Sequence, residues 1–75
     1  MTKLPNISGE KVIRALRRDG FLVERQKGSH VQLKKKSGGE TIKLTVPLHS
    51  ELRKGTLNRI LKEANLTVDN LIALL

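Results

Sequence analysis

The chain has no cysteine, tryptophan or tyrosine and only one phenylalanine among its 75 residues. Without cysteine it can form neither a disulfide framework nor a thiolate metal site. Proteins that bind single-stranded nucleic acid by stacking bases use several aromatic side chains, so the composition argues against that class of binder. No apolar run approaches the length of a membrane span, and the first ten residues, MTKLPNISGE, lack the regions of a signal peptide. We therefore expect a cytoplasmic protein that does not associate with membranes.

Acidic residues are also few, 7 against 15 lysines and arginines, which gives a net charge of +8 at pH 7. The excess lies between residues 11 and 62, which hold 14 basic and 4 acidic residues, whereas residues 63–75 hold two acids and no base. Such a charge distribution attracts a polyanion or an acidic protein, and we favour nucleic acid over a merely soluble basic surface. A chain of this length has room for one small domain, which we expect to span residues 1–75.

The first half of the chain predicts one helix and three strands. Ser8 is a good helix N-cap and Gly20 a good terminator, so the first helix lies between them. Three short runs follow, of which the second and third alternate clearly between apolar and polar residues. Turns at residues 27–29 and 37–39 separate the runs, and Pro47 ends the third because proline cannot donate to a strand ladder.

The second half of the chain predicts helices. After a basic loop at residues 49–55, apolar residues recur at helical spacing from Leu57 to Ala64. Asn65 is a good left-handed terminator, and Thr67 begins a short final helix. The expected fold is therefore α+β, in the order α-β-β-β-α. A three-stranded antiparallel sheet packs on the helices, and a short extra helix ends the chain.

The second predicted strand has two unlike faces. Val31 and Leu33 alternate with His30, Gln32 and Lys34, so one face of the sheet is apolar and the other polar and basic. The apolar face should pack on the helices. The polar face is then the place where His30 and the basic side chains could meet a ligand.

His30 and His49 are the only imidazoles, and no paired carboxylates stand near them, so we expect neither a metal ion nor a cofactor. Ser29 directly precedes His30 and cannot present its hydroxyl to that imidazole as a catalytic triad requires. Cleavage of RNA needs fewer catalytic groups from the protein, because the 2′-hydroxyl of the substrate is the nucleophile. An imidazole can accept its proton near neutral pH while Lys or Arg stabilises the phosphate charge. On the residues alone, a lone histidine at the start of a strand is more often exposed and without a catalytic role.

A module that binds structured RNA without cutting it is the alternative. Binders of double-stranded RNA use shape, phosphate and 2′-hydroxyl contacts, which require no aromatic side chains. The predicted element order matches that module, and its usual contact points have counterparts at residues 27–30 and at Arg53 and Lys54. A DNA regulator of the helix-turn-helix class is a weaker third possibility, because the last helix is acidic and apolar.

Four segments, in order, resemble the HicA-type toxin family, the mRNA interferases of toxin–antitoxin pairs: SGEKVIRALRRDGF, RQKGSHVQL, TVPLHS and KGTLNRILKEANLTVDNLIALL. The resemblance covers nearly the whole chain from Ser8 onward. It implies a fold like the double-stranded-RNA-binding domain, metal-independent cleavage of mRNA, and neutralisation by a HicB-type antitoxin. It also implies that the histidine of the G-S-H motif, here His30, is catalytic.

The remaining polar and basic residues of these segments are expected to contact RNA. They are Lys27, Ser29, Gln32, Lys34, Lys36, Lys43, His49, Arg53 and Lys54. Lys35 is a further cation that we expect to hold phosphate.

Overall fold

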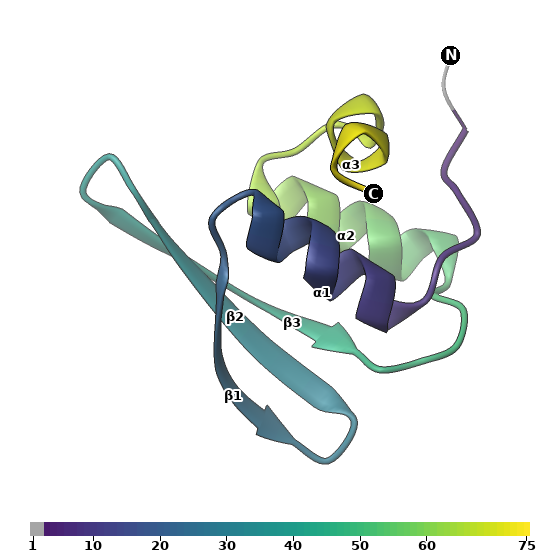
Figure 1. The fold of residues 1–75 in the computed structure, drawn as a ribbon, viewed down its shortest axis with the longest axis horizontal. Coiled ribbons are helices and arrows are strands. Elements are labelled where there is room, and N and C mark those ends of the chain that lie inside the picture. Colours follow the sequence, from purple (N-terminus) through teal and green to yellow (C-terminus); the bar gives the residue numbers. More distant parts are fainter. Residues whose placement is uncertain (1–2) are drawn as a thin grey trace.

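The computed structural model describes residues 3–75 and shows an α+β fold (Figure 1). The helices are α1 (Gly9–Arg18), α2 (Lys54–Ala64) and α3 (Val68–Leu74), and the strands are β1 (Leu22–Lys27), β2 (His30–Ser37) and β3 (Glu40–Pro47). The strands form one antiparallel sheet in the order β1-β2-β3. The predicted fold class and element order are confirmed. The predicted domain, residues 1–75, includes Met1 and Thr2, which lie outside the described residues.

α1 begins and ends where its capping residues predict. The Ser8 hydroxyl accepts a hydrogen bond from the Lys11 backbone N–H at 3.2 Å, which satisfies one free donor of the first turn. At the other end Gly20 has a φ of 110°, a conformation that favours glycine, and the Phe21 N–H donates to the Leu16 carbonyl at 2.9 Å. This Schellman-type ending turns the chain into β1 and buries Phe21 in the core.

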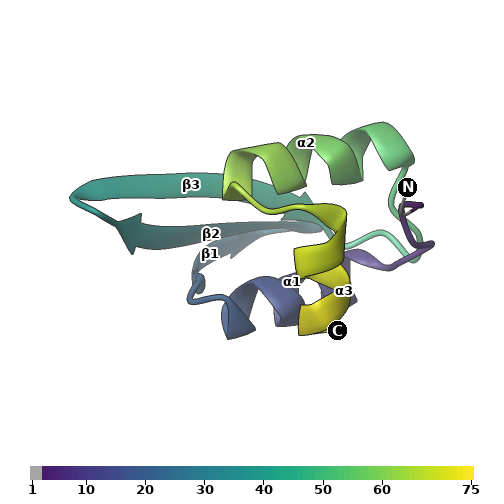
Figure 2. The ribbon, with the colours of Figure 1, turned by 90° about the horizontal axis from the view of Figure 1, so that it is seen from above.

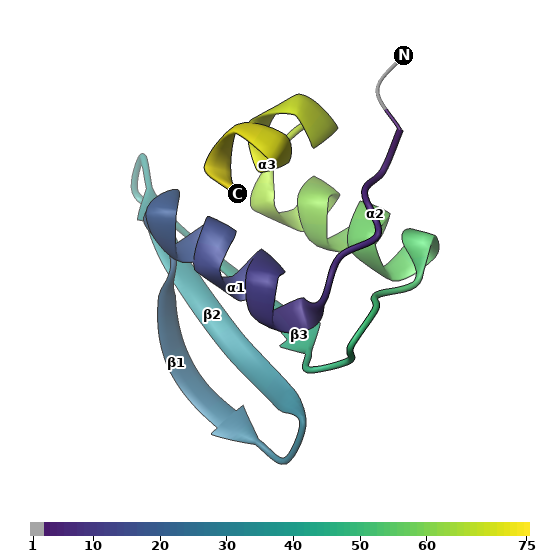
Figure 3. The same ribbon diagram turned by 45° about the vertical axis from the view of Figure 1, so that its right-hand side comes forward.

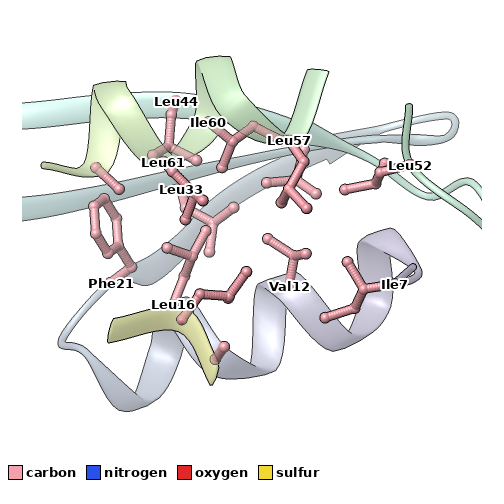
Figure 4. Close-up of a cluster of buried hydrophobic side chains, with 14 of the residues drawn as sticks. Ile7, Val12, Leu16, Phe21, Leu33, Leu44, Leu52, Leu57, Ile60 and Leu61 are labelled. Atoms are coloured by element: carbon pink, nitrogen blue, oxygen red, sulfur yellow. The ribbon is translucent and has the colours of Figure 1, made fainter. Parts of the chain in front are cut away.

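The sheet has one apolar face, and all three helices lie on that side of it (Figures 1 and 2). Val31 and Leu33 of β2 lie opposite Val46 and Leu44 of β3, and all four side chains are buried. Figure 4 shows Leu33, Leu44 and other core side chains between α1, α2 and the sheet. The alternate residues of the strands point to the opposite side. That side is therefore left for polar and charged groups.

β1 is an edge strand whose six residues are all exposed. Its pairing with β2 shifts by one residue between Val23 and Arg25, which marks a β-bulge at Glu24. Val23 lies opposite Leu33 on the apolar side but is 45% exposed, because the helices pack over the β3 side of the sheet. The bulge therefore changes which β1 residues share the polar face.

Lys35 lies on the apolar side of the sheet, opposite Ile42. Its Nζ is 2.9 Å from the Asp19 Oδ2 and 5.7 Å from the centre of the Phe21 ring. Lys35 therefore joins β2 to the end of α1 on the side away from the polar face, and the expectation that it holds phosphate stays a prediction. Strand alternation explains this placement, because Lys35 stands two residues after Leu33 and therefore lies on the same side of the sheet.

α2 begins earlier than predicted. Arg53 is its N-cap residue, with an extended backbone and no side-chain cap, so Lys54 is already helical although it falls in the predicted loop at residues 49–55. Asn65 ends α2 in the left-handed conformation, as predicted, with a φ of 62°. Thr67 caps α3, and its capping box with Asn70 has two hydrogen bonds of 3.0 Å.

α3 buries less of its apolar surface than its composition suggests. Leu71 is fully buried, and Val68 and Leu74 are partly buried against the core. Ile72 of α3 is 43% exposed, and Leu75, which follows the helix, is 49% exposed. Between residues 3 and 75, no helix has the length and hydropathy needed to span a bilayer.

Candidate functional site

The side of the sheet away from the helices collects basic side chains from all three strands, and we call it the basic face. Lys27 of β1 lies opposite His30 of β2, and Lys34 of β2 lies opposite Lys43 of β3. Gln32 lies between His30 and Lys34 on the same face. Strand pairing therefore brings together these five residues, all of them predicted from the sequence as site residues.

A hollow of about 160 Å³ opens on the basic face around His30. Its walls are Arg25, Lys27, His30, Gln32 and Thr45. The Arg25 Nε donates a hydrogen bond to the Gln32 Oε1 at 3.1 Å. Because this bond uses only one N–H group of the guanidinium, the others can donate to an anion in the hollow. The hollow thus combines an exposed imidazole with two exposed cations.

Two walls of the hollow, Arg25 and Thr45, were not predicted from the sequence as site residues. A signal for Arg25 was present, because it stands two residues before Lys27 and alternation places both on one face. Thr45 lies opposite Gln32 on β3 and follows from the same rule once the strand register is known. These positions could therefore have been found by extending the alternation to the first and third strands.

Lys34 and Lys43 form a directly opposed pair of like charges on the basic face. Such a cross-strand pair is destabilising by about 0.2–1 kcal/mol. The Glu24 carboxylate, which the bulge allows to reach this face, lies 3.8 Å from the Lys43 Nζ, but this ion pair is exposed and weak. An anion between the two ammonium groups removes their repulsion, so the pair favours phosphate binding.

A family model described as HicA toxin of bacterial toxin–antitoxin matches residues 9–66, which cover α1, the whole sheet and α2. The chain belongs to this family. It is therefore a HicA-family toxin, and membership implies an antitoxin partner. A comparison with curated proteins finds no match. All five walls of the hollow lie within the matched segment.

In this HicA-family toxin, His49 lies at the same end of the sheet as His30 but outside the hollow. The Leu48 N–H donates to the Ser29 carbonyl at 2.6 Å, which joins the segment after β3 to the turn before β2. The Gly9 N–H donates to the His49 carbonyl at 3.0 Å, so the start of α1 holds the same segment. The side chain of His49 is exposed. RNA contact by Ser29 and His49 stays a prediction.

Three other predicted contact residues of the toxin lie away from the hollow. Arg53 and Lys54 are exposed at the start of α2, on the helical side of the sheet, and the first turn of α2 has no acidic residue. Lys36 is six residues along β2 from His30, roughly 20 Å at the usual rise of a strand. These cations lie too far away to reach an anion bound beside His30. RNA contact by Lys36, Arg53 and Lys54 stays a prediction, and it requires an RNA that extends well beyond the hollow.

The chemistry open to the hollow is proton transfer and stabilisation of negative charge. The His30 imidazole can accept or donate a proton, and Arg25 and Lys27 can stabilise an anionic phosphate. Over residues 3–75, no three histidine, aspartate or glutamate side chains are grouped so that they could hold a metal ion. The groups that the hollow itself offers to a reaction are the His30 imidazole and the two cations.

Proposed function

We propose that the toxin is an endoribonuclease that cleaves mRNA in the cytoplasm without a metal ion, with His30 as the general base. The position of His30 carries the proposal, because its exposed imidazole shares a hollow with Arg25 and Lys27. A phosphodiester in this hollow would lie beside both a proton acceptor and two positive charges. The family supports the toxin role, and RNA is the polyanion whose own 2′-hydroxyl completes the reaction.

The reaction follows from the roles of the four side chains. His30 accepts the proton of the 2′-hydroxyl, and the 2′ oxygen attacks the adjacent phosphorus. The bond from phosphorus to the 5′ oxygen breaks, which leaves a 2′,3′-cyclic phosphate, and the 5′ oxygen takes a proton from solvent. Arg25 and Lys27 stabilise the charge that grows on the phosphate oxygens. Gln32 is a positioning residue, because its hydrogen bond orients the Arg25 guanidinium.

The other predicted cations bind the RNA backbone on either side of the cleaved bond. Lys34 and Lys43 extend the basic face from the hollow, and Lys36 lies further along β2. Arg53 and Lys54 bind a second part of a folded substrate, as the resemblance to double-stranded-RNA-binding domains implies. Because phosphate contacts release counterions, RNA affinity should fall steeply as the salt concentration rises.

A HicB-type antitoxin is the partner that we propose for neutralisation. A protein that presents an acidic surface to the basic face is drawn to it electrostatically and occludes His30. Hydroxyl-radical footprinting of the complex tests this arrangement. A footprint confined to residues 63–75, with the basic face still exposed, would contradict it.

A non-catalytic RNA-binding module is the second candidate. One observation favours it: the five walls of the hollow include a single imidazole, so the leaving oxygen has no partner acid of the same kind. Incubation of the toxin with an RNA and with the same sequence carrying 2′-deoxy linkages separates the two. Cleavage confined to ribose linkages, with 2′,3′-cyclic phosphate ends, supports the ribonuclease. Intact RNA at protein concentrations that saturate binding supports the module.

A further inference from the structure

A second basic surface lies on α1. Lys11, Arg14 and Arg18 follow one another at helical spacing along one side of this helix, and all three are exposed. α1 packs on the apolar side of the sheet, whereas His30 and its hollow lie on the opposite face. A phosphodiester held beside His30 is therefore out of reach of these cations. The proposed cleavage reaction therefore does not use these three cations.

The three cations line a groove of about 300 Å³ between α1, the segment that precedes it and the end of α3. Figure 3 shows these three parts of the chain beside one another. The groove also has an apolar lining, to which Pro5, Ile7, Ala15, Leu74 and Leu75 contribute. The Arg18 guanidinium donates to the Leu74 carbonyl at 2.7 Å and holds the end of α3 against α1. The apolar residues and the cations that line the groove are therefore held in place by the packing of α3 on α1.

The charges of the groove are poorly compensated by the chain itself. The side chains of its lining include three cations and no carboxylate. Glu10 lies 2.8 Å from Arg14, but both side chains are about two-thirds exposed, so this helical ion pair contributes little. Leu75 remains 49% exposed at the apolar floor. A ligand that brings both negative charge and apolar side chains would complement this groove.

We propose that the groove binds an acidic amphipathic segment of the antitoxin. Aspartate or glutamate side chains of the segment face Lys11, Arg14 and Arg18, and its apolar side chains cover Leu74 and Leu75. RNA would supply the negative charge but no aliphatic side chains for the floor. The contact lies apart from the hollow, so it holds the antitoxin by a surface that the cleaved RNA does not use. It depends on the antitoxin partner that the family implies and not on the chemistry of His30.

The test compares two matched double variants of the full chain, Lys11→Glu/Arg14→Glu and Arg59→Glu/Lys62→Glu. Each reverses two exposed positive charges on a helix and removes one exposed ion pair between residues four apart, Arg14–Glu10 or Arg59–Glu63. Arg18 is left unchanged because it holds α3. Affinity for the co-expressed cognate antitoxin is measured by calorimetry. RNA affinity, cleavage rate and thermal midpoint are measured on the same samples.

The antitoxin affinity of the α1 variant should fall at least about 10-fold, and that of the α2 variant by less than about 3-fold, since a like-charge contact is far costlier than a change in net charge. RNA cleavage should be unchanged in both. Equal losses in the two variants would overturn the proposal, because only net charge would then matter. A loss of RNA affinity in the α1 variant alone would assign the groove to RNA and overturn it too.

Two further variants keep the test decisive. If charge reversal lowers the thermal midpoint, Lys11→Gln/Arg14→Gln repeats the comparison without new like-charge contacts inside α1. Leu75→Ser leaves the charge unchanged and should weaken antitoxin binding by about 3-fold, because it removes apolar area from the interface. Unchanged affinity of Leu75→Ser would show that the segment is not amphipathic. A parent toxin that fails to cleave RNA would refute the proposed function and leave these binding comparisons intact.

Discussion

Replacement of His30 by alanine is the most direct test of the proposed reaction. If its imidazole takes the 2′-hydroxyl proton in the transition state, His30→Ala should lower the single-turnover rate of RNA cleavage by about 10²–10⁴-fold, the usual contribution of a positioned acid or base. The measurement uses saturating protein and a short end-labelled RNA, so that neither product release nor weak binding limits the rate.

The structure also predicts what His30→Ala leaves unchanged. His30 is exposed on the basic face, so its removal should alter the free energy of unfolding by less than about 0.5 kcal/mol. RNA affinity should change little, because Arg25, Lys27, Lys34 and Lys43 remain to bind phosphates. Thermal midpoint and RNA affinity are therefore measured with the rate.

His49→Ala is the matched control, because it removes the other imidazole from the same end of the sheet but from outside the hollow. Its cleavage rate should stay within about 10-fold of the parent, below the range expected for a positioned base. A His30→Ala protein that is folded, binds RNA and cuts near the parent rate would refute the reasoning. His30 would then be an exposed residue that merely starts β2.

Cleavage of a short unstructured RNA should survive excess EDTA, and activity that returns only with stoichiometric metal would contradict the proposed chemistry. Arg25→Ala should lower the cleavage rate by about 10²-fold, since it removes a charge beside the phosphate, whereas Arg17→Ala on α1 should not. Gly9→Ala should destabilise the fold by about 1–3 kcal/mol in calorimetry, because the new Cβ would collide with the Pro47 carbonyl oxygen. A Cβ at Gly55 would meet no neighbouring atom, so the control Gly55→Ala should stabilise α2 by about 0.5–1 kcal/mol. Equal effects of the two glycine variants would argue against the close packing at Gly9.

The parts of the fold that the sequence predicts well are those set by neighbouring residues. Ser8 and Gly20 bound α1 because a cap depends on the few backbone groups next to it. Asn65 and Thr67 act in the same local way at α2 and α3. The start of α2 was predicted less well. Arg53 makes no side-chain cap, so no residue there signals the boundary.

Features that depend on contacts between elements were not visible in the sequence. The β-bulge at Glu24 follows from how β1 meets β2, and no turn residue announces it. The ion pair of Lys35 with Asp19 joins β2 to α1 and required both strand parity and the place where α1 ends. The exposure of Ile72 depends on how little of α3 faces its neighbours.

The candidate site likewise has one part that the sequence predicts and one part that depends on contacts between strands. The common face of His30, Gln32 and Lys34 follows from the two-residue period of a strand. The hollow itself needs the register of three strands, which sets Arg25 and Thr45 around the imidazole. From the sequence, a catalytic role for His30 was only implied by the resemblance to a family, because periodicity places a side chain but does not assign it a reaction.

The directly opposed lysines of the basic face couple ligand binding to the stability of the native state. Lys34 lies directly across from Lys43, and only the weak, exposed ion pair with Glu24 offsets their repulsion, so a polyanion or an acidic protein bound to this face would stabilise the native state by mass action. The unliganded toxin is then the form most often unfolded, and the one most open to proteases. If these two residues attract a ligand as proposed, they would make the resistance of the toxin to proteolysis depend on whether that ligand is bound.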